Sequence, residues 1–527
     1  MPRLTYEQAL SESLRDRRTL GAATIARARW RWGRVAVQEQ RGDISRLRLA
    51  AAALVIRDRL GLAPEERRVG VMLPPGRGGA VVNLALALGG RTSVNLNHTA
   101  GDVQIRRMVE MADLRTIVSS RLYLERLGQP ELPGRVVLAE DVLGGLSKPA
   151  VVWAMLKVIA LPSRWLDRAR PDDVATIIFS SGTTGDPKGV QLTHRQVLAN
   201  CGAMVEHVEI APDSATLLTA LPLFHSFGLV PGMWMCLCYG VRIAAHPDPL
   251  DATGIGVMAE KSGAGYMIST PTFVRSYMRR VTPEQFKRLR FSVVGAEKCP
   301  SELHAAFRAQ YPNSVLLEGY GCTELAPVVA GNRPGAIREG TVGWPLPGIE
   351  VFTVDPDTLA RQPDGMEGLL VARSPARMQG YLGRDDLTAA AFIHGGYNTG
   401  DVATIDPAGV ITITGRLARF AKVGGEMVPL DNVEGVLRSW LAANQPDDAV
   451  EIAVCAVPDA KRGERLLVLH VGALPVSAHE LLASLDGMPT LWRPRQVDFH
   501  AVEAIPVLGT GKRDLGALKR MAVLLGA

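Results

Sequence analysis

Several features that would assign this chain to a specialised class are scarce or missing. Only 6 of the 527 residues are cysteine, and no two of them have C-x-x-C spacing. No stretch reaches the roughly 18 apolar residues of a membrane span, and the charged N-terminal residues lack the apolar segment of a secretory signal. The sequence therefore predicts no disulfide framework, no transmembrane helix and no signal peptide, and it favours a reducing, cytoplasmic compartment.

Charge of one sign is not in large excess either. Lys plus Arg total 59 and Asp plus Glu total 53, which leaves a formal net charge of +6. This excess is compatible with an acidic partner, but it is not the footprint of a nucleic-acid-binding protein, so no nucleic acid is expected. The 47% hydrophobic content allows a large core, and about 150 residues per domain suggests roughly three or four domains. Cys236 and Cys238 lie in an apolar run and are expected to be buried thiols.

Short β-rich runs alternate with helical patterns up to about residue 415. Buried strands are expected at residues 68–73, 92–95, 174–180, 241–245, 265–269 and 291–295, and a helix at 80–88. This alternation predicts an α/β fold with a large N-terminal domain of layered, mostly parallel sheets and helices. The pattern changes near Gly415, which predicts an N-terminal body of residues 1–415 and a small, mobile α+β C-terminal domain of residues 416–527. In that domain Asp431 is expected to cap a helix, with Glu434 as its capping-box partner.

Residues 148–170 form an unusual segment. A mostly apolar stretch carries Trp153 and Trp165 near its ends and is flanked by basic residues, namely Lys148, Arg164, Arg168 and Arg170. Apolar stretches with basic and Trp flanks are typical of segments that lie in a membrane interface. The alternative is a helix that covers the core and ends at Pro162. The sequence alone does not distinguish these two interpretations.

The strongest local pattern is IIFSSGTTGDPKGV at residues 177–190. A buried strand is followed by a cluster of hydroxyl and glycine residues, then by a lysine: Ser180, Ser181, Gly182, Thr183, Thr184, Gly185 and Lys188. Glycines let backbone N–H groups approach a phosphate, and the ammonium adds charge. The alternative is a plain Ser/Gly turn. The pattern is not a Walker A loop, because Pro187 precedes the lysine and Gly189 follows it.

This loop resembles the phosphate-binding motif of the adenylate-forming (acyl-activating) enzyme superfamily. Further motifs of that superfamily follow in order: LPLFHSFGL at 221–229, GAEK at 295–298, EGYGCTE at 318–324, YNTGD at 397–401, GR at 415–416 and PVLGTGK at 506–512. The resemblance covers nearly the whole chain. It implies that ATP and Mg²⁺ are bound by the N-terminal body.

The resemblance also implies roles for individual residues. His225 would line the route to the reacting carboxylate, although a lone histidine in an apolar run is often only a core residue. The adenine-site segments contribute Ala296, Glu318, Gly319, Tyr320 and Gly321. Among the phosphate and metal groups, Thr323 would contact a phosphate, and Glu324 would hold Mg²⁺ together with Thr184, as carboxylates do for hard cations. Asp401 would accept hydrogen bonds from the ribose, and Arg416 would lie near ribose and phosphate.

The C-terminal domain carries two candidate catalytic lysines. By resemblance, Lys512 bridges the acyl carboxylate and the α-phosphate, and Lys422 acts when the C-terminal domain rotates for the second half-reaction. The usual alternative for each is a solvated surface charge. At the hinge position of the family, usually Asp or Lys, this chain has Ala418, so hinge behaviour does not transfer directly.

Within the superfamily the motifs look most like the acyl-[acyl-carrier-protein] synthetase portion of bifunctional 2-acylglycerophosphoethanolamine acyltransferase/acyl-carrier-protein synthetases. The implied reaction joins a long-chain fatty acid to the phosphopantetheine of acyl carrier protein, in the cytoplasm and peripherally at the inner face of the membrane. The alternatives are a long-chain acyl-CoA synthetase, with coenzyme A as acceptor, and a nucleotide-binding pseudoenzyme at a membrane. His246 and Asp251 have the H-x-x-x-x-D spacing of acyltransferases, which is interpreted as chance because prolines lie between them.

Overall fold

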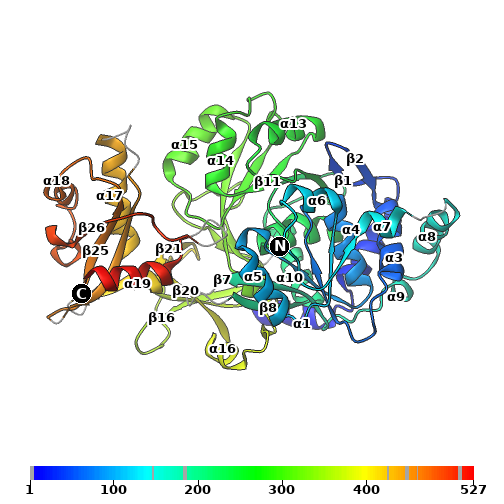
Figure 1. Ribbon diagram of the computed structural model, residues 1–527, viewed down its shortest axis with the longest axis horizontal. Coiled ribbons are helices and arrows are strands. Elements are labelled where there is room, and N and C mark those ends of the chain that lie inside the picture. The colour runs from blue at the N-terminus through cyan, green and yellow to red at the C-terminus, as the bar shows by residue number, and fades with distance from the viewer. Residues whose placement is uncertain are drawn as a thin grey trace.

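The computed structural model describes residues 5–144, 148–181, 187–423, 426–444, 450–459, 461–507 and 513–526. Over these residues the chain forms a large α/β body with a smaller α+β unit at its C-terminal end (Figure 1). The α/β prediction is therefore confirmed. Among the helices of the described ranges, none combines the length and hydropathy that a bilayer crossing needs.

Two large sheets organise the N-terminal body. One has seven strands in the order β18-β8-β7-β4-β3-β5-β6. They are β3 Arg68–Val71, β4 Thr92–Asn95, β5 Thr116–Ser119, β6 Arg135–Leu138, β7 Val174–Ser181, β8 Pro187–Thr193 and β18 Gly380–Tyr381. Neighbouring strands from β7 to β6 pair in parallel, whereas β8, near one edge, pairs antiparallel with both β7 and β18.

The second sheet has nine strands in the order β15-β14-β13-β12-β11-β9-β10-β1-β2. They are β1 Val35–Glu39, β2 Gly42–Ser45, β9 Thr216–Thr219, β10 Arg242–Ala245, β11 Tyr266–Ser269, β12 Phe291–Val294, β13 Val315–Gly321, β14 Val328–Gly331 and β15 Trp344–Pro345. Its central pairs are parallel, so the carboxyl ends of β11, β12 and β13 meet at one edge.

Helices cover these sheets. They are α1 Tyr6–Arg15, α2 Leu20–Trp30, α3 Arg46–Arg59, α4 Arg77–Leu88, α5 Asp102–Met111, α6 Arg121–Arg126, α7 Ala139–Gly144, α8 Lys148–Ala160, α9 Ser163–Leu166, α10 His194–His207, α11 Ser226–Leu229, α12 Cys236–Tyr239, α13 Ala252–Ser262, α14 Pro271–Met278, α15 Ser301–Gln310 and α16 Asp385–Ala390. Short turns of helix are η1 His98–Ala100, η2 Val230–Met235, η3 Thr323–Leu325 and η4 Leu417–Arg419.

A third, antiparallel sheet leads to the C-terminal unit. It contains β16 Glu350–Val354, β17 Gly368–Arg373, β19 Phe392–Ile393, β20 Gly396–Ile405 and β21 Ile411–Arg416. The last sheet contains β22 Phe420–Val423, β23 Glu426–Pro429, β24 Ile452–Asp459, β25 Gly463–Val471 and β26 Phe499–Val502. It is accompanied by α17 Leu430–Asn444, α18 Ala478–Ala483, α19 Leu515–Gly526 and the turns η5 Thr490–Trp492 and η6 Gln496–Asp498.

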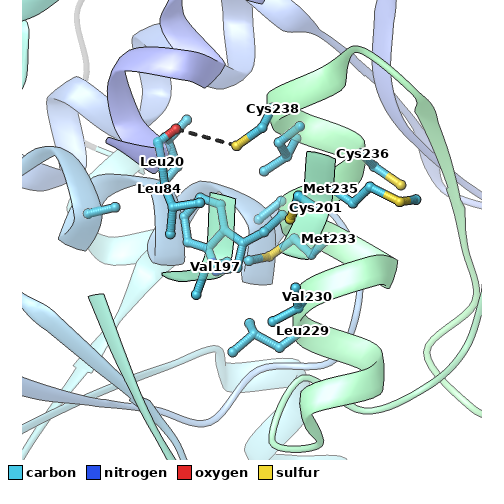
Figure 2. Packing of buried hydrophobic residues seen from close by; sticks show 14 of the residues in the cluster. Leu20, Leu84, Val197, Cys201, Leu229, Val230, Met233, Met235, Cys236 and Cys238 are labelled. Atoms are coloured by element: carbon cyan, nitrogen blue, oxygen red, sulfur yellow. Dashed lines mark hydrogen bonds between the residues drawn. The ribbon is translucent and has the colours of Figure 1, made fainter. Parts of the chain in front are cut away.

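One part of the core of the N-terminal body contains several sulfur-containing side chains. Figure 2 shows the cysteines and methionines of α10, η2 and α12 among aliphatic side chains from neighbouring helices. Cys236 and Cys238 are buried, as the sequence predicts, and burial raises the pKa of the Cys238 thiol to about 12. Such thiols stay protonated at neutral pH and act as packing groups.

One local prediction is wrong. Helix α17 begins at Leu430, so Asp431 lies in its first turn and does not cap it. The Asp431 carboxylate accepts a hydrogen bond from Arg419 Nε (2.7 Å), and Glu434 is buried beneath arginine side chains. A capping box is a local device. Here contacts with residues distant along the chain determine where both carboxylates point.

Candidate active site

Lys188 stands at the base of the predicted phosphate loop. In the β7–β8 hairpin Ser180 pairs with Lys188, and Ser181 pairs with Pro187. The hairpin therefore fixes the lysine beside the strand from which the loop begins. Its Nζ atom lies 5.3 Å from the ring centroid of Tyr381, a distance at which an ammonium is attracted by an aromatic face. Gly182, Thr183, Thr184 and Gly185 lie outside the described residues, and their roles stay predictions.

Glu324 reaches the same tyrosine. It lies in η3 and is buried, and Tyr381 Oη donates to its Oε1 at 2.9 Å. The hydroxyl of Tyr397 is 3.3 Å from that of Tyr381. Burial, followed by the charge of Glu324, raises the pKa of Tyr381, so the phenol remains a donor at neutral pH. Tyr381 thus joins the ammonium of Lys188 to the carboxylate of Glu324.

Thr323 connects this cluster to the predicted acyl-pocket motif. Its hydroxyl is 3.2 Å from the hydroxyl of Ser226, the first residue of α11. His225 directly precedes that helix and is half-buried, with its ring centroid 6.2 Å from that of Phe224. The structure therefore brings His225 to the same part of the molecule as Thr323 and Glu324.

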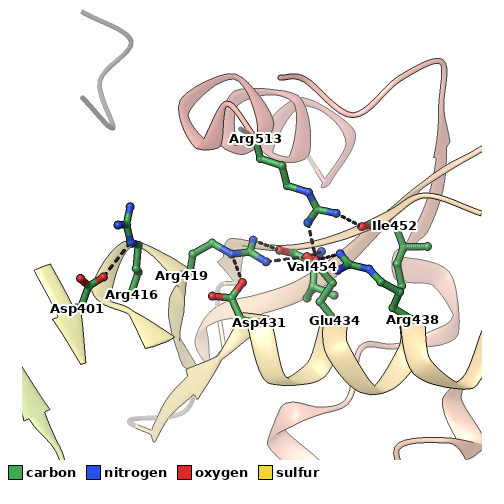
Figure 3. A network of polar contacts seen from close by, with 9 residues as sticks. All are labelled: Asp401, Arg416, Arg419, Asp431, Glu434, Arg438, Ile452, Val454 and Arg513. Atoms are coloured by element: carbon green, nitrogen blue, oxygen red, sulfur yellow. Dashed lines mark hydrogen bonds and ion pairs between the residues drawn. The ribbon is translucent and has the colours of Figure 1, made fainter. Parts of the chain in front are cut away.

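A second buried carboxylate lies nearby. The side chain of Asp401, in β20, is 5% exposed. It accepts from Tyr320 Oη at 2.5 Å and from Arg416 Nε at 2.8 Å (Figure 3 shows the arginine contact). The charge of Asp401 raises the pKa of Arg416, whereas burial, and then Asp401, raise the pKa of Tyr320. Three residues assigned to adenosine from separate motifs thus form one hydrogen-bonded group.

The segments that follow β12 and β13 approach each other closely. A Cβ atom on Gly295 would lie 3.0 Å from the Gly319 carbonyl oxygen, and one on Gly321 would lie 2.1 Å from the Pro327 carbonyl oxygen. Ala296 adopts a φ of 68°, a left-handed conformation uncommon outside glycine. Backbone compression of this kind clusters at ligand sites, which agrees with the predicted role of these segments.

Glu318 has a different immediate role. Its Oε1 accepts a hydrogen bond from the Cys299 backbone N–H at 3.0 Å, and the side chain is buried. Burial raises its pKa. The contact fastens the segment after β12, in which Ala296 lies, to β13. A direct contact between Glu318 and a nucleotide stays a prediction.

An apolar cavity of about 50 Å³ lies beside these segments. Its lining includes Phe227, Val293 and Gly319 together with Met204 and Met235. Methionine side chains are flexible and adapt to irregular ligands. The cavity therefore offers an apolar space next to the polar cluster, and a long chain would enter it only as these side chains move.

Lys422 lies apart from the two buried carboxylates. It is exposed in β22, and its Nζ lies 3.2 Å from an oxygen of Asp357, which follows β16 of the N-terminal body. Its backbone N–H donates to Glu464 at 2.6 Å. The structure thus pairs Lys422 with a surface carboxylate and does not bring it to Glu324 or Asp401. A catalytic role requires a different placement of the C-terminal sheet.

Lys512 and residues 508–511 before it lie outside the described residues, but both flanks are described. Val507 and Arg513 form a β-bridge, and Arg513 donates to Glu434 at 2.5 Å and to the Ile452 carbonyl at 2.7 Å (Figure 3). Glu434 also accepts from Arg419 Nη2 and the Val454 N–H, and pairs with Arg438. The buried carboxylate therefore connects Arg513, the residue after Lys512, to Arg419, which lies close to the end of β21.

Two residues that organise these contacts, Tyr381 and Glu434, are not marked as such by any sequence motif. Tyr381 reaches Lys188 because β18 pairs directly with β8, although the two strands are far apart in the sequence, and no motif marks this tyrosine. Glu434 carries no catalytic pattern either. Both become visible only when elements distant in sequence are placed together.

Comparison with known proteins identifies the family. Residues 45–382 match the family described as AMP-binding enzyme. The chain belongs to the AMP-binding enzyme family. This match covers the segments that hold Lys188, His225, Tyr320 and Glu324. Asp401, Arg416 and the two lysines of the C-terminal unit lie beyond it.

Relatives of this AMP-binding enzyme include several CoA ligases. A Mycobacterium tuberculosis 3-[(3aS,4S,7aS)-7a-methyl-1,5-dioxo-octahydro-1H-inden-4-yl]propanoyl:CoA ligase is 28% identical over 90% of this chain and 91% of its own length. An Escherichia coli O157:H7 long-chain-fatty-acid–CoA ligase is 31% identical over 65% of this chain. The matched segments span 65% of the rice 4-coumarate–CoA ligase-like 4 and 60% of the Escherichia coli ligase.

Solved structures show the same fold. The o-succinylbenzoate CoA synthetase of Bacillus subtilis, in complex with its acyl-adenylate intermediate, has a TM-score of 0.81 at 20% identity and covers 96% of this chain and 98% of its own. ATP-bound MatB from Rhodopseudomonas palustris has a TM-score of 0.78 at 24% identity, over 95% and 99% of the two chains. At these identities the likeness establishes the architecture of the enzyme alone.

Replacing Asp401 by Asn tests the buried carboxylate. The variant loses the charge that binds Arg416 and, by the predicted role, an acceptor for ribose hydroxyls. Hydrogen bonds to charged groups contribute about 1.5–3 kcal/mol, so we expect AMP affinity to fall about 10- to 100-fold in calorimetry. Asp364→Asn, at an exposed loop position, is the matched control. Equal affinity in Asp401→Asn and wild type would exclude this role.

Replacing Glu434 by Gln tests the C-terminal anchor. Burial alone would raise the pKa of Glu434, but the charges of Arg419, Arg513 and Arg438 outweigh burial and lower it below 4.5. Breaking a buried ion pair costs about 3–5 kcal/mol, which urea unfolding measures against the exposed control Glu503→Gln. A lowered pKa means that the stabilisation is full above pH 4.5 and is lost as the pH falls through the folded-state value. The difference between wild type and Glu434→Gln should therefore shrink at acid pH; a constant difference would contradict the account.

Proposed function

We propose that this AMP-binding enzyme activates a long-chain fatty acid as its acyl-adenylate and then transfers the acyl group to the phosphopantetheine thiol of an acyl carrier protein. One observation carries the adenylation step. Lys188 and Glu324 meet at Tyr381, within the same body that holds the Tyr320–Asp401–Arg416 group and an apolar cavity. This arrangement supports a single site for phosphate, nucleoside and acyl binding.

In the first step a carboxylate oxygen of the fatty acid attacks the α-phosphorus of ATP, and pyrophosphate leaves. Lys188 stabilises negative charge on the phosphates, Asp401 and Arg416 orient the nucleoside, and Lys512 bridges the two reacting groups. Such a step is accelerated by positioning and by charge stabilisation. Glu324 and Tyr381 are buried, and exclusion of water from the closed site would protect the adenylate from hydrolysis.

Glu324 suits a role in holding Mg²⁺. It is a buried carboxylate that shares Tyr381 with Lys188, and Mg²⁺ is commonly bound by one or two carboxylates plus substrate phosphates. Thr184 is the second proposed ligand. When bound, the ion would neutralise phosphate charge. A Bacillus subtilis relative by fold has been solved with ATP and a magnesium ion.

In the second step the thiol sulfur attacks the acyl carbonyl, AMP leaves, and the thiol proton passes to solvent. Lys422 is proposed to serve here after the C-terminal sheet has turned, with residues 416–419 as the hinge and Ala418 in place of the usual charged residue. The contact between Lys422 and Asp357 is exposed on both sides and contributes little stability, so it would not prevent the turn.

A second candidate acceptor is coenzyme A. The relatives named above are CoA ligases, and this favours CoA on the basis of similarity. The acyl carrier protein is favoured by the motif resemblance and is compatible with the net charge of +6. Acyl transfer to holo carrier protein and to CoA, followed side by side, distinguishes them. Turnover of CoA alone would overturn the carrier-protein proposal.

Lys512→Ala tests the adenylation step through fatty-acid-dependent ATP–pyrophosphate exchange. Losing one preorganised charge contact to a reacting group costs on the order of 10²- to 10³-fold in rate, so exchange should fall by about that factor. Lys519→Ala, exposed in α19, should exchange at the wild-type rate. Exchange that survives Lys512→Ala would exclude the role of this lysine, and absence of exchange in the wild type would favour a pseudoenzyme.

Val293→Phe tests the apolar cavity. The added ring would fill the space beside Gly319, since Val293 already lies 3.3 Å from a Cβ position on that glycine. We expect KM for long-chain fatty acids to rise about tenfold or more, whereas KM for ATP stays unchanged. Exchange measured across fatty acids of increasing length gives the readout. The same KM for every chain length in wild type and variant would place the acyl chain elsewhere.

A further inference from the structure

Helix α8 has one packed face and one uncovered apolar face. Ala154 and Val158 are buried against the body, and α3 is the main neighbour of the helix. Four apolar residues on the other side are about half exposed or more: Val152 at 53%, Trp153 at 60%, Leu156 at 49% and Ile159 at 52%. We call these four residues the outer face of α8. Their spacing places them on one stripe of the helix, and Figure 1 shows α8 at the edge of the body farthest from the C-terminal unit.

The charges within α8 and α9 are of one sign. Residues 148–166 contain no Asp or Glu but include Lys157 and Arg164. Lys157 Nζ lies 5.7 Å from the ring centroid of Trp153. In α9 the side chain of Trp165 is 66% exposed. An apolar stripe with tryptophans and a basic border has the composition of a helix that lies in a membrane interface.

A large basic pocket is lined in part by residues that follow α9 in the sequence. Its volume is about 730 Å³, and its lining contains five arginines with one acidic residue, Asp173: Arg67, Arg68, Arg91, Arg168 and Arg170. Burial and the charge of Arg67, opposed in part by Glu66, lower the pKa of Arg91, with Arg168 adding to this effect. Arg168 has a carboxylate partner in Asp58, at 3.5 Å. The pocket therefore carries an excess of positive charge and suits phosphate groups.

This pocket is separate from the candidate active site. It lies where β3, β4 and β7 begin, with Arg68, Thr92 and Val174 in its lining. Ile177 and Gln191 extend the lining to the middle of β7 and β8. Ser180 and its pairing partner Lys188 lie toward the other end, six residues from Val174, which at about 3.3 Å per residue is roughly 20 Å. A nucleotide at Asp401 and Glu324 thus leaves the arginine pocket unused.

We propose that the outer face of α8, Trp165 and the arginine pocket together dock this enzyme on the surface of an anionic lipid bilayer. The apolar side chains would enter the interface while the arginines contact lipid phosphates. Hydrophobic contact and charge attraction act jointly in such binding. The surface goes beyond the proposed ligase reaction, because it would work with either acyl acceptor, and it would hold the enzyme where long-chain fatty acids gather.

Vesicle flotation of the full-length protein, without ATP or fatty acid, tests this surface. The protein should float with vesicles of phosphatidylcholine mixed with phosphatidylglycerol, float far less with phosphatidylcholine alone, and be released by salt. Leu156→Glu combined with Ile159→Glu should reduce binding about tenfold or more, because two apolar side chains lose their burial. Arg67→Gln combined with Arg170→Gln should lower binding to the anionic vesicles specifically.

Leu250→Glu combined with Val257→Glu is the matched control, since it adds the same charge at exposed apolar positions elsewhere; it should bind like wild type. All variants should keep ATP–pyrophosphate exchange in the absence of vesicles, which shows that they fold. Wild-type binding that ignores lipid charge, or α8 variants that bind like wild type, would overturn the proposal. The proposal would also be overturned if these variants instead dissociated a dimer or a complex with carrier protein. Exchange without flotation would contradict the docking surface alone, and flotation without exchange would contradict the ligase alone.

Discussion

A buried carboxylate needs a partner of opposite charge or hydrogen-bond donors, and Asp401 is the one on which this architecture depends. Tyr320 comes from the parallel sheet and Arg416 from the end of β21, and both bind the same side chain. Burying this carboxylate without partners would cost far more free energy than its hydrogen bonds contribute. These contacts therefore join the third sheet to the second where the nucleoside is expected to bind. They also hold Arg416, the last residue before the connection to the C-terminal unit.

The same principle operates again on the other side of the junction. Three residues after Arg416, Arg419 is buried against Glu434 and donates to the Val454 carbonyl. Glu434 in turn holds Arg513, the residue after Lys512. A rotation about residues 417 and 418 would leave both carboxylate clusters intact (Figure 3). Two hydrogen-bonded clusters joined by a short connection are compatible with the proposed rotation.

Much of the fold follows from local sequence patterns. The expected strands at 92–95 and 174–180 correspond to β4 and β7 almost residue for residue. The mostly apolar run of β7 is typical of a buried strand in a parallel sheet. The glycine and hydroxyl motifs likewise identify Tyr320, Asp401 and Arg416 before their contact is known. What the sequence does not reveal are partners across long separations. Tyr381 joins Lys188 to Glu324 without belonging to any motif. Glu434 fits a capping-box pattern with its near neighbours, but its partners Arg419 and Arg513 come from outside α17.

The central claim is that the carboxylate of the fatty acid becomes bonded to the α-phosphorus of ATP. Fatty acid labelled with oxygen-18 in its carboxylate tests this directly when the AMP released after complete turnover is analysed by mass spectrometry. The account predicts that AMP carries one labelled oxygen, because the carbonyl carbon releases that oxygen when the thiol attacks. Unlabelled AMP, with the label in inorganic phosphate, would mean activation at the γ-phosphorus and would contradict the account.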